Sequence, residues 1–221
     1  MATPYLQLRR EEVTSTQDVA ASELDRFPVV VISQRQTTGR GRSGAGWVTA
    51  PRALAVSVAF EADSEDDRPF SLIAGVAAAR VMADIGLKWP NDLLLGTDKI
   101  GGILVERSER RVVAGLGVNL WWPEPPTGTG ALCEADPGES LHSELGALWA
   151  ADFLQLVDSP GWPREEYRSR CATVGKEVAW EPEGRGLAVD ISDEGGLVVE
   201  REGKQTVVWS GAVRHLRDLP H

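Results

Sequence analysis

The sequence predicts an α+β fold, in which a mixed or antiparallel sheet with flanking helices is followed by a small β-barrel. Two observations lead to this prediction. Three strand-like segments follow one another over residues 86–122, with helical segments on either side. From Gly175 onward, short strand-like segments alternate with glycine turns at nearly regular spacing, which is typical of a small barrel. We place the boundary near residue 172, which gives domains of residues 1–172 and 173–221.

The first predicted elements are a helix and a buried strand. Residues 14–24, "TSTQDVAASEL", offer Thr14 or Ser15 as the N-cap of a helix with one apolar face. Residues 27–34, "FPVVVISQ", are typical of a short buried strand. No core pattern is evident before about residue 13. We therefore expect no room for an N-terminal DNA-reading domain.

A glycine-rich loop is predicted to connect this strand to a second one. The loop, residues 36–47, reads "QTTGRGRSGAGW", and residues 53–62 after it alternate as a strand does. Residues 69–86 then fit a helix that begins at Pro69 and stops at Gly86.

The next predicted elements are strands at residues 86–95, 99–110 and 110–122, of which the last two form a hairpin that turns near residues 108–111. Residues 121–140 are rich in proline and glycine, and we expect either a lid that faces a partner or a partly disordered loop. Helical spacing resumes over residues 141–157, and a short helix is expected within residues 163–174.

Composition excludes several classes of protein. The net charge of −10 argues against broad nucleic-acid binding, which depends on many lysines and arginines. The longest apolar runs fall short of the roughly 20 residues that a membrane span needs, and the N-terminus lacks the pattern of a signal peptide. Cys133 and Cys171 stand far apart and suggest neither a zinc site nor a disulfide. We expect a cytoplasmic protein with reduced thiols.

The glycine-rich loop carries the first chemical signal. Its glycines match the spacing of a dinucleotide-binding fingerprint, but that fingerprint requires a following helix, and a strand follows here. An ordinary surface loop, in which the glycines permit tight turns, remains an alternative. Arg40 and Arg42 favour another interpretation, because glycines let backbone amides approach an anion while guanidinium groups bind its oxygens. We interpret the segment as an anion-binding loop.

Three later segments support this interpretation, although each has an ordinary explanation when taken alone. "KWPND", residues 88–92, places a cation, an aromatic ring and two short polar side chains around a proline turn. Lys99 precedes a glycine pair, where a lysine is usually solvated. Asn119 stands at a strand end where the pattern predicts an apolar residue.

Together these segments carry a family resemblance. In their order and separation, "TSTQ", "QTTGRGRSGAGW", "KWPND", "KIGGIL" and "GLGVNL" resemble the biotin protein ligase family, and the C-terminal segment resembles that family's SH3-like domain. The resemblance spans nearly the whole chain. It implies a class II synthetase-like catalytic domain and, since no DNA-binding segment is evident, a monofunctional ligase.

The resemblance implies a two-step reaction that uses ATP, Mg²⁺ and biotin. Biotin would be activated to biotinyl-AMP and then transferred to a lysine of a biotin carboxyl carrier domain. Because a carboxylate must meet a polyphosphate, fixed cations have to neutralise both. Lys99 is expected to contact the biotin carboxylate and the α-phosphate, Arg42 the α-phosphate, and Arg40 the carboxylate or the pyrophosphate.

Matching residue by residue also implies two binding sets. The biotin-binding set is Ser15, Thr16, Gln36, Gly39, Arg40, Gly41, Lys99 and Gly102, and the nucleotide-binding set is Arg42, Trp47, Lys88, Asn91, Asp92 and Asn119. Asp92 is also the candidate to orient Mg²⁺ or the incoming lysine. One departure concerns Gln17, because the family commonly has asparagine there. The arginine loop is expected to be disordered without ligand and to close over it.

Other functions remain open at this stage. A lipoate-protein ligase shares the chemistry, although its loop would lack the double arginine. A non-catalytic biotin-binding module is another alternative, for which the phosphate-binding cations would be superfluous. The β module could also be the main functional part, as a protein-docking domain. A homodimer could form by edge pairing of the segment "RRVVAGLGVNL", unless that strand is covered.

Overall fold

The structure is a computed structural model that describes residues 3–42, 46–180, 184–209 and 214–215. Its elements are β1(Leu6–Val13), α1(Thr16–Glu23), β2(Val29–Gln36), β3(Arg52–Glu61), α2(Phe70–Val81), β4(Ile85–Lys88), β5(Asp92–Leu95), β6(Asp98–Ser108), β7(Arg111–Trp121), α3(Leu141–Asp158), α4(Arg164–Arg170), β8(Glu177–Trp180), β9(Gly184–Ile191), β10(Leu197–Arg201), β11(Lys204–Val208) and β12(Arg214–His215).

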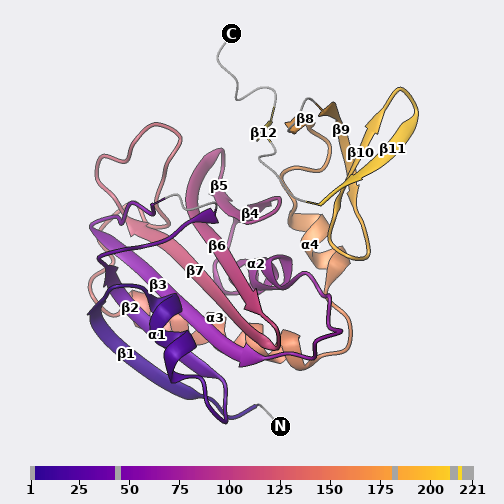
Figure 1. Cartoon of the computed structure of the whole chain (residues 1–221). Helices are drawn as coiled ribbons and strands as arrows, with labels where there is room; N and C mark the ends of the chain where they lie inside the picture. The colour runs from indigo at the N-terminus through magenta and orange to yellow at the C-terminus, as the bar shows by residue number, and fades with distance from the viewer. Residues whose placement is uncertain (1–2, 43–45, 181–183, 210–213, 216–221) are drawn as a thin grey trace.

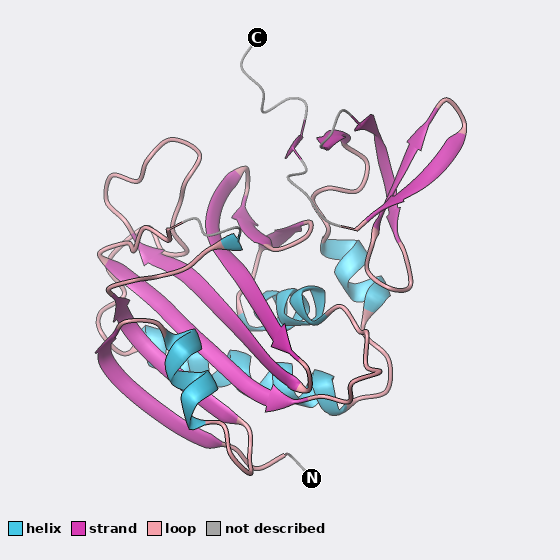
Figure 2. Cartoon of the chain, viewed as in Figure 1, coloured by secondary structure: helices cyan, strands magenta, loops and turns pink. Residues whose placement is uncertain are grey.

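A seven-stranded mixed sheet forms the larger part of the molecule (Figure 1). Its strand order is β1-β2-β3-β7-β6-β5-β4, and the β1–β2 pair is parallel whereas the other pairs are antiparallel. This confirms the predicted α+β class. Helices cover both faces of the sheet, with α1 on one side and α2 and α3 on the other (Figure 2).

Alternate residues of β2 show how both faces are buried. Val30 and Ile32 belong to the large core that includes Trp149 of α3, whereas Val29 and Val31 belong to a smaller core with Ala20 of α1. Successive side chains of a strand point to opposite faces, so a strand covered on both sides needs an uninterrupted apolar run. The run at residues 29–32 therefore follows from the position of β2 between two helical layers.

Two sequence predictions about element ends are wrong. The second helix ends at Val81 rather than at Gly86, because Asp84 adopts a positive φ of 63° and Ile85 already begins β4. The single strand predicted at residues 86–95 is instead a hairpin of β4 and β5, which turns over residues 89–91. Alternation alone did not distinguish one long strand from two short ones.

The N-terminal strand was missed by the sequence pattern. β1 pairs with β2 in parallel register from Leu6 to Val13, and its side chains are mostly exposed, because it is an edge strand with charged residues at positions 9–12. Such charges discourage further strand pairing. Of the two alternatives for residues 110–120, an edge strand free to pair or a covered strand, the structure shows the covered strand, since β7 lies between β3 and β6 in the interior of the sheet.

The C-terminal segment forms a second sheet with the strand order β11-β10-β9-β8-β12 (Figure 1). Short strands and glycine turns are present as predicted, but the described residues form an open sheet rather than a closed barrel. β12 contributes only Arg214 and His215, which pair with β8.

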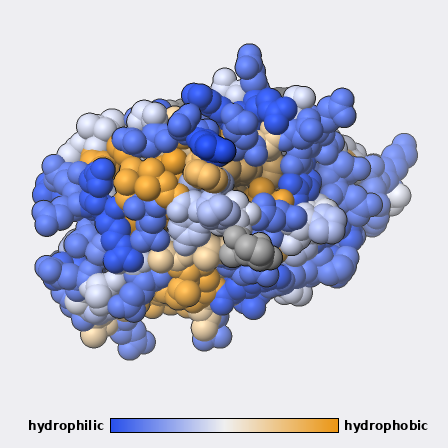
Figure 3. Space-filling view, turned by 90° about the horizontal axis from the view of Figure 1, so that it is seen from below, coloured by the Kyte–Doolittle hydropathy of each residue, from blue (hydrophilic) through white to orange (hydrophobic). Residues whose placement is uncertain are grey.

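One face of the surface is mainly hydrophilic, with a few separate hydrophobic patches (Figure 3). Within the described part of the chain, no helix combines the length and apolar character that crossing a membrane requires. Both cysteines are free, and burial raises the pKa of the Cys133 and Cys171 thiols, so both stay protonated near neutral pH.

Candidate active site

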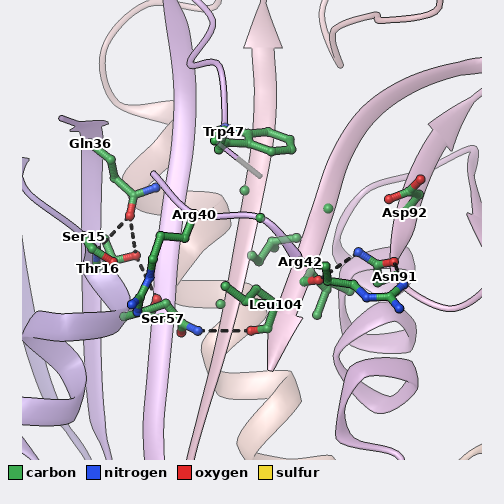
Figure 4. A pocket seen from close by; sticks show the side chains of 18 of the residues that line it. Ser15, Thr16, Gln36, Arg40, Arg42, Trp47, Ser57, Asn91, Asp92 and Leu104 are labelled. Atoms are coloured by element: carbon green, nitrogen blue, oxygen red, sulfur yellow. Dashed lines mark hydrogen bonds between the residues drawn. The ribbon is translucent and has the colours of Figure 1, made fainter. Parts of the chain in front are cut away.

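A cavity of about 270 Å³ opens on the α1 side of the large sheet. Its walls come from α1, the β2–β3 loop, and strands β2, β3, β5, β6 and β7. Small-molecule sites typically measure roughly 300–1,000 Å³, so this cavity is near the lower limit. Figure 4 shows two unlike ends, with Thr16, Gln36 and Ser57 at one end and Asn91 and Asp92 at the other.

Buried hydrogen bonds build the first end, which we call the polar end and define as Ser15, Thr16, Gln17, Gln36 and Ser57. Oε1 of Gln36 accepts hydrogen bonds from Thr16 N at 2.8 Å and from Thr16 Oγ1 at 3.1 Å. The Thr16 and Ser57 hydroxyl oxygens lie 2.8 Å apart. Because these groups are already oriented before any ligand binds, they form a preorganised site for a neutral polar group.

Ser15 is the N-cap residue of α1, as one of the two predicted alternatives. Its hydroxyl makes no capping hydrogen bond to the helix, although the residue is only 1% exposed and lines the cavity. The N-cap side chain therefore faces the site instead of closing the helix end.

Two glycines and a tryptophan form the middle of the cavity. Gly102 of β6 and Gly117 of β7 are paired across the sheet, and the indole of Trp47 lies over both. A Cβ at Gly117 would come within 3.3 Å of the indole. The lack of side chains at these two positions is what allows Trp47 to lie on the sheet and close the cavity.

Paired charges build the second end, which we call the charged end and define as Arg42, Asn91, Asp92 and Lys99. Lys99 Nζ lies 2.6 Å from Asp92 Oδ1, and Arg42 Nη1 donates to Asn91 Oδ1 at 3.0 Å. The Lys99 ammonium also lies 6.0 Å from the centre of the Trp47 ring. The side chains of Lys99 and Asp92 are 40% and 23% exposed. An anionic ligand can therefore replace Asp92 as the partner of the Lys99 ammonium group.

Arg40 does not belong to the charged end. Its Nη2 lies 2.8 Å from Asp18 Oδ1 and 2.9 Å from Glu106 Oε2, so two carboxylates neutralise it beside the polar end (Figure 4). The loop was expected to be disordered because its cations would repel one another. Arg40 and Arg42 instead have separate partners, which reduces that repulsion. Residues 43–45 of the loop lie outside the described part, so for them disorder without ligand stays a prediction.

The "KWPND" segment holds Asn91 and Asp92 of the charged end in place. Trp89 is only 2% exposed, and its Nε1 donates to the carbonyl of Gly195 in the C-terminal sheet at 2.9 Å. Its backbone N–H donates to Thr173 Oγ1 at 3.0 Å. Trp89 therefore anchors the turn to the C-terminal segment, while Asn91 and Asp92 after it reach the cavity.

The proline- and glycine-rich segment is a loop in which Lys99 N donates to Gly128 O and Gly130 N donates to Lys99 O. Asn119 Nδ2 donates to Gly130 O at 3.0 Å, which adds a side-chain tie to the same loop. Arg52 holds the far part of the loop through Asp136 at 3.0 Å. The loop thus holds the backbone of Lys99 in place.

The cavity brings together most of the residues that the sequence singled out. They are Ser15, Thr16, Gln36, Arg40, Gly41, Arg42, Trp47, Asn91, Asp92, Lys99 and Gly102. Three others do not line it. Gly39 accepts a hydrogen bond from Trp47 N, Lys88 is paired with Asp92 across β4 and β5, and Asn119 lies near the end of β7, where its Oδ1 is buried and has no hydrogen-bond partner among the described residues.

Sequence reasoning did not identify Ser57, Gly115, Gly117 or Leu104 as lining residues, and it treated Gln17 only as a departure from a motif. Ser57 did carry a signal, since it is a polar residue in the middle of an otherwise apolar strand. Gly115 and Gly117 interrupt the apolar run of β7 in the same way.

A metal site made by the protein alone is not present in the described part of the chain, where no three histidine, cysteine, aspartate or glutamate residues gather. Asp92 provides one carboxylate at the charged end. Mg²⁺ is usually held by one or two carboxylates together with substrate phosphates. The residues present therefore fit a Mg²⁺ ion that arrives with a nucleotide.

Comparison with known proteins gives three findings. The profile of the Biotin/lipoate A/B protein ligase family matches residues 11–120. A biotin--[acetyl-CoA-carboxylase] ligase of Mycobacterium tuberculosis is 36% identical over 220 residues, with 90% of this chain and 83% of that protein covered, and the Paracoccus denitrificans ligase of the same name is 27% identical, with 83% and 88% covered. The Aquifex aeolicus biotin protein ligase, solved with biotin and ATP, shares the fold with a TM-score of 0.83 at 23% identity, covering 95% of this chain and 99% of that one.

Proposed function

The chain belongs to the biotin protein ligases of the Biotin/lipoate A/B protein ligase family, and from this premise we propose that it activates biotin with ATP and transfers it to a carrier-domain lysine. The observation that carries this function is the unlike character of the two ends of one cavity. The polar end suits the neutral ureido head of biotin, and the charged end suits a carboxylate and a phosphate.

In the first step, a carboxylate oxygen of biotin attacks the α-phosphorus of ATP, and the bond to pyrophosphate breaks. Negative charges must approach to bonding distance, so the charged end has to supply positive charge. We assign Lys99 to the biotin carboxylate and the α-phosphate, and Arg42 to the α-phosphate. The contacts to Asp92 and Asn91 support this assignment, because they hold both cations toward the same end before ligand binds.

In the second step, the acceptor amine attacks the carbonyl carbon of biotinyl-AMP, and AMP leaves. A phosphate that takes over Lys99 releases Asp92 from its ion pair. The freed carboxylate then accepts the proton of the acceptor amine. In the first step the same carboxylate, with phosphate oxygens, would hold a Mg²⁺ ion that neutralises the polyphosphate. Trp47 over the cavity limits the access of water to the mixed anhydride.

Roles outside the cavity are assigned on the family resemblance. We propose that Asn119 lies on the nucleotide side of the site, where its buried, unpaired Oδ1 is suited to accept an N–H. Gly39 is assigned to the ring of biotin, and Lys88 to the nucleotide side. The acceptor is a biotin carboxyl carrier domain, and the reaction takes place in the cytoplasm without DNA as a partner. A homodimer, if it forms, uses a surface other than β7.

The test is mass spectrometry of a biotin carboxyl carrier domain incubated with the protein, biotin, ATP and Mg²⁺. One added biotinyl group is expected with the wild type, and little with Lys99→Ala. Omission of ATP should abolish the modification. The same assay with lipoate in place of biotin tests the lipoate-ligase alternative. Biotin binding without exchange between pyrophosphate and ATP would instead indicate a non-catalytic binding module.

A further inference from the structure

Gln17 has an amide whose orientation is set by its surroundings. Its Nε2 donates to the carbonyl of Leu104 at 3.3 Å and to Glu106 Oε2 at 3.2 Å. Both partners are acceptors, so a rotated amide would place oxygen against oxygen. The nitrogen therefore faces β6, and its two protons are used.

The oxygen of the same amide lies in the wall of the cavity. Gln17 is only 5% exposed and lines the cavity, and its Oε1 is buried without a donor among the described residues. Gly115 lies opposite, where an added Cβ would come within 2.9 Å of Oε1 and 3.1 Å of Ser57 Oγ. The glycine thus leaves space beside the acceptor that a Cβ would fill. A buried acceptor without a donor costs free energy that a ligand N–H can recover.

The neighbouring polar side chains already have hydrogen-bond partners. Gln36 Oε1 takes two donors from Thr16, and the Thr16 and Ser57 hydroxyls are paired with each other. Among the described residues that line the cavity, Gln17 Oε1 is the buried side-chain oxygen that has no hydrogen-bond partner. A ligand with an N–H group can donate to Gln17 Oε1. A ligand with an apolar sulfur-containing ring in the same place leaves this oxygen without a donor.

We propose that Gln17 is a specificity-determining residue, whose Oε1 accepts a hydrogen bond from one N–H of the ureido ring of biotin. This inference rests on the proposed function. The family more commonly has asparagine at this position, and the asparagine side chain is one methylene shorter, so it does not make the same contact. Sites that pair with a ligand N–H discriminate strongly against ligands that lack it.

The test compares biotin with two cyclic carbamate analogues, in each of which oxygen replaces one of the two ring N–H groups. Isothermal titration gives the ratio of the Kd of each analogue to that of biotin, for the wild type and for Gln17→Met. For one analogue we expect this ratio to fall by about tenfold in Gln17→Met, because the variant removes the acceptor that distinguishes N–H from oxygen. For the other analogue the ratio stays unchanged.

Glu106→Gln is the matched control, since it retains an acceptor for Gln17 Nε2 and does not line the cavity. Its ratios should equal those of the wild type. Should Gln17→Met fail to fold, Gln17→Leu serves the same purpose. Ratios that do not change for either analogue in the Gln17 variants would overturn the inference, even if biotin itself binds less tightly. A wild-type protein that neither binds biotin nor transfers it would overturn the proposed function instead.

Discussion

The polar end and the charged end of the cavity differ in how their groups are held. At the polar end, Thr16 and Ser57 are at most 3% exposed and bonded to each other. At the charged end, Lys99 is 40% exposed and paired with a single carboxylate. Buried hydrogen bonds fix a shape for recognition, whereas partly exposed ion pairs are weak enough to exchange. From this difference we expect binding and chemistry to be separable in this protein.

The largest expected effect concerns Lys99. Lys99→Met should lower the rate of biotin-dependent exchange between pyrophosphate and ATP by about 100- to 1,000-fold, since it removes the charge that we propose stabilises the transition state. Biotin affinity should fall by about fivefold or less, as expected of a partly exposed ionic contact. Lys204→Met, the same change at an exposed lysine of β11, is the control. Equal losses in exchange and in biotin binding would contradict the separation of the two ends.

The second prediction compares the two arginines of the loop. Arg42→Met should reduce exchange by about 100-fold, because Arg42 faces the charged end. Arg40→Met should reduce it by about tenfold or less, since Asp18 and Glu106 already neutralise that guanidinium. Steady-state exchange at saturating biotin measures both. If the Arg40 variant loses more activity than the Arg42 variant, the assignment of Arg42 to the charged end is wrong.

Thr16→Val tests the polar end. The substitution keeps the shape of the side chain but removes its bonds to Gln36 and Ser57, so the free energy of unfolding should drop by about 1–3 kcal/mol. Biotin affinity should fall by about tenfold, while the exchange rate at saturating biotin changes little. Urea denaturation and calorimetric titration provide the two measurements. A large loss of rate with normal affinity would place Thr16 in the chemistry rather than in recognition.

The smallest effect is expected away from both ends. The Arg80 guanidinium, by its hydrogen bond, lowers the pKa of Glu166 below its ordinary value of 4.5 and joins α2 to α4. A lowered pKa in the folded protein means that the carboxylate contributes stability above the unfolded value, and that this contribution is lost as the pH falls through the folded value. Glu166→Gln should therefore cost less than about 1 kcal/mol at pH 7.

Thermal unfolding measured from pH 7 to pH 3 checks this. The difference between the wild type and Glu166→Gln should be constant down to about pH 5 and should shrink below 4.5. Exchange activity should stay unchanged throughout the stable range. A difference that grows on acidification would contradict the assigned ion pair.

The sequence by itself determined the class of fold and singled out most of the polar and charged residues that line the cavity. Local patterns predicted three features: the apolar run at residues 29–32, the hairpin turn near residues 108–111 and the helix over residues 141–157. Such features depend mainly on the identities of neighbouring residues. Arg42 and Lys99 were also recognisable, since charged residues beside glycines stand out from their surroundings.

Only the tertiary structure decided how these groups are partnered. That Lys99 meets Asp92, that Arg40 meets Asp18 and Glu106, and that Gln17 presents an unpaired oxygen beside Gly115 depends on the register of β5, β6 and β7 and on the position of α1 over them. These contacts join residues as far as 98 positions apart, from 17 to 115. No local pattern specifies such distances, because they result from the packing of the whole sheet.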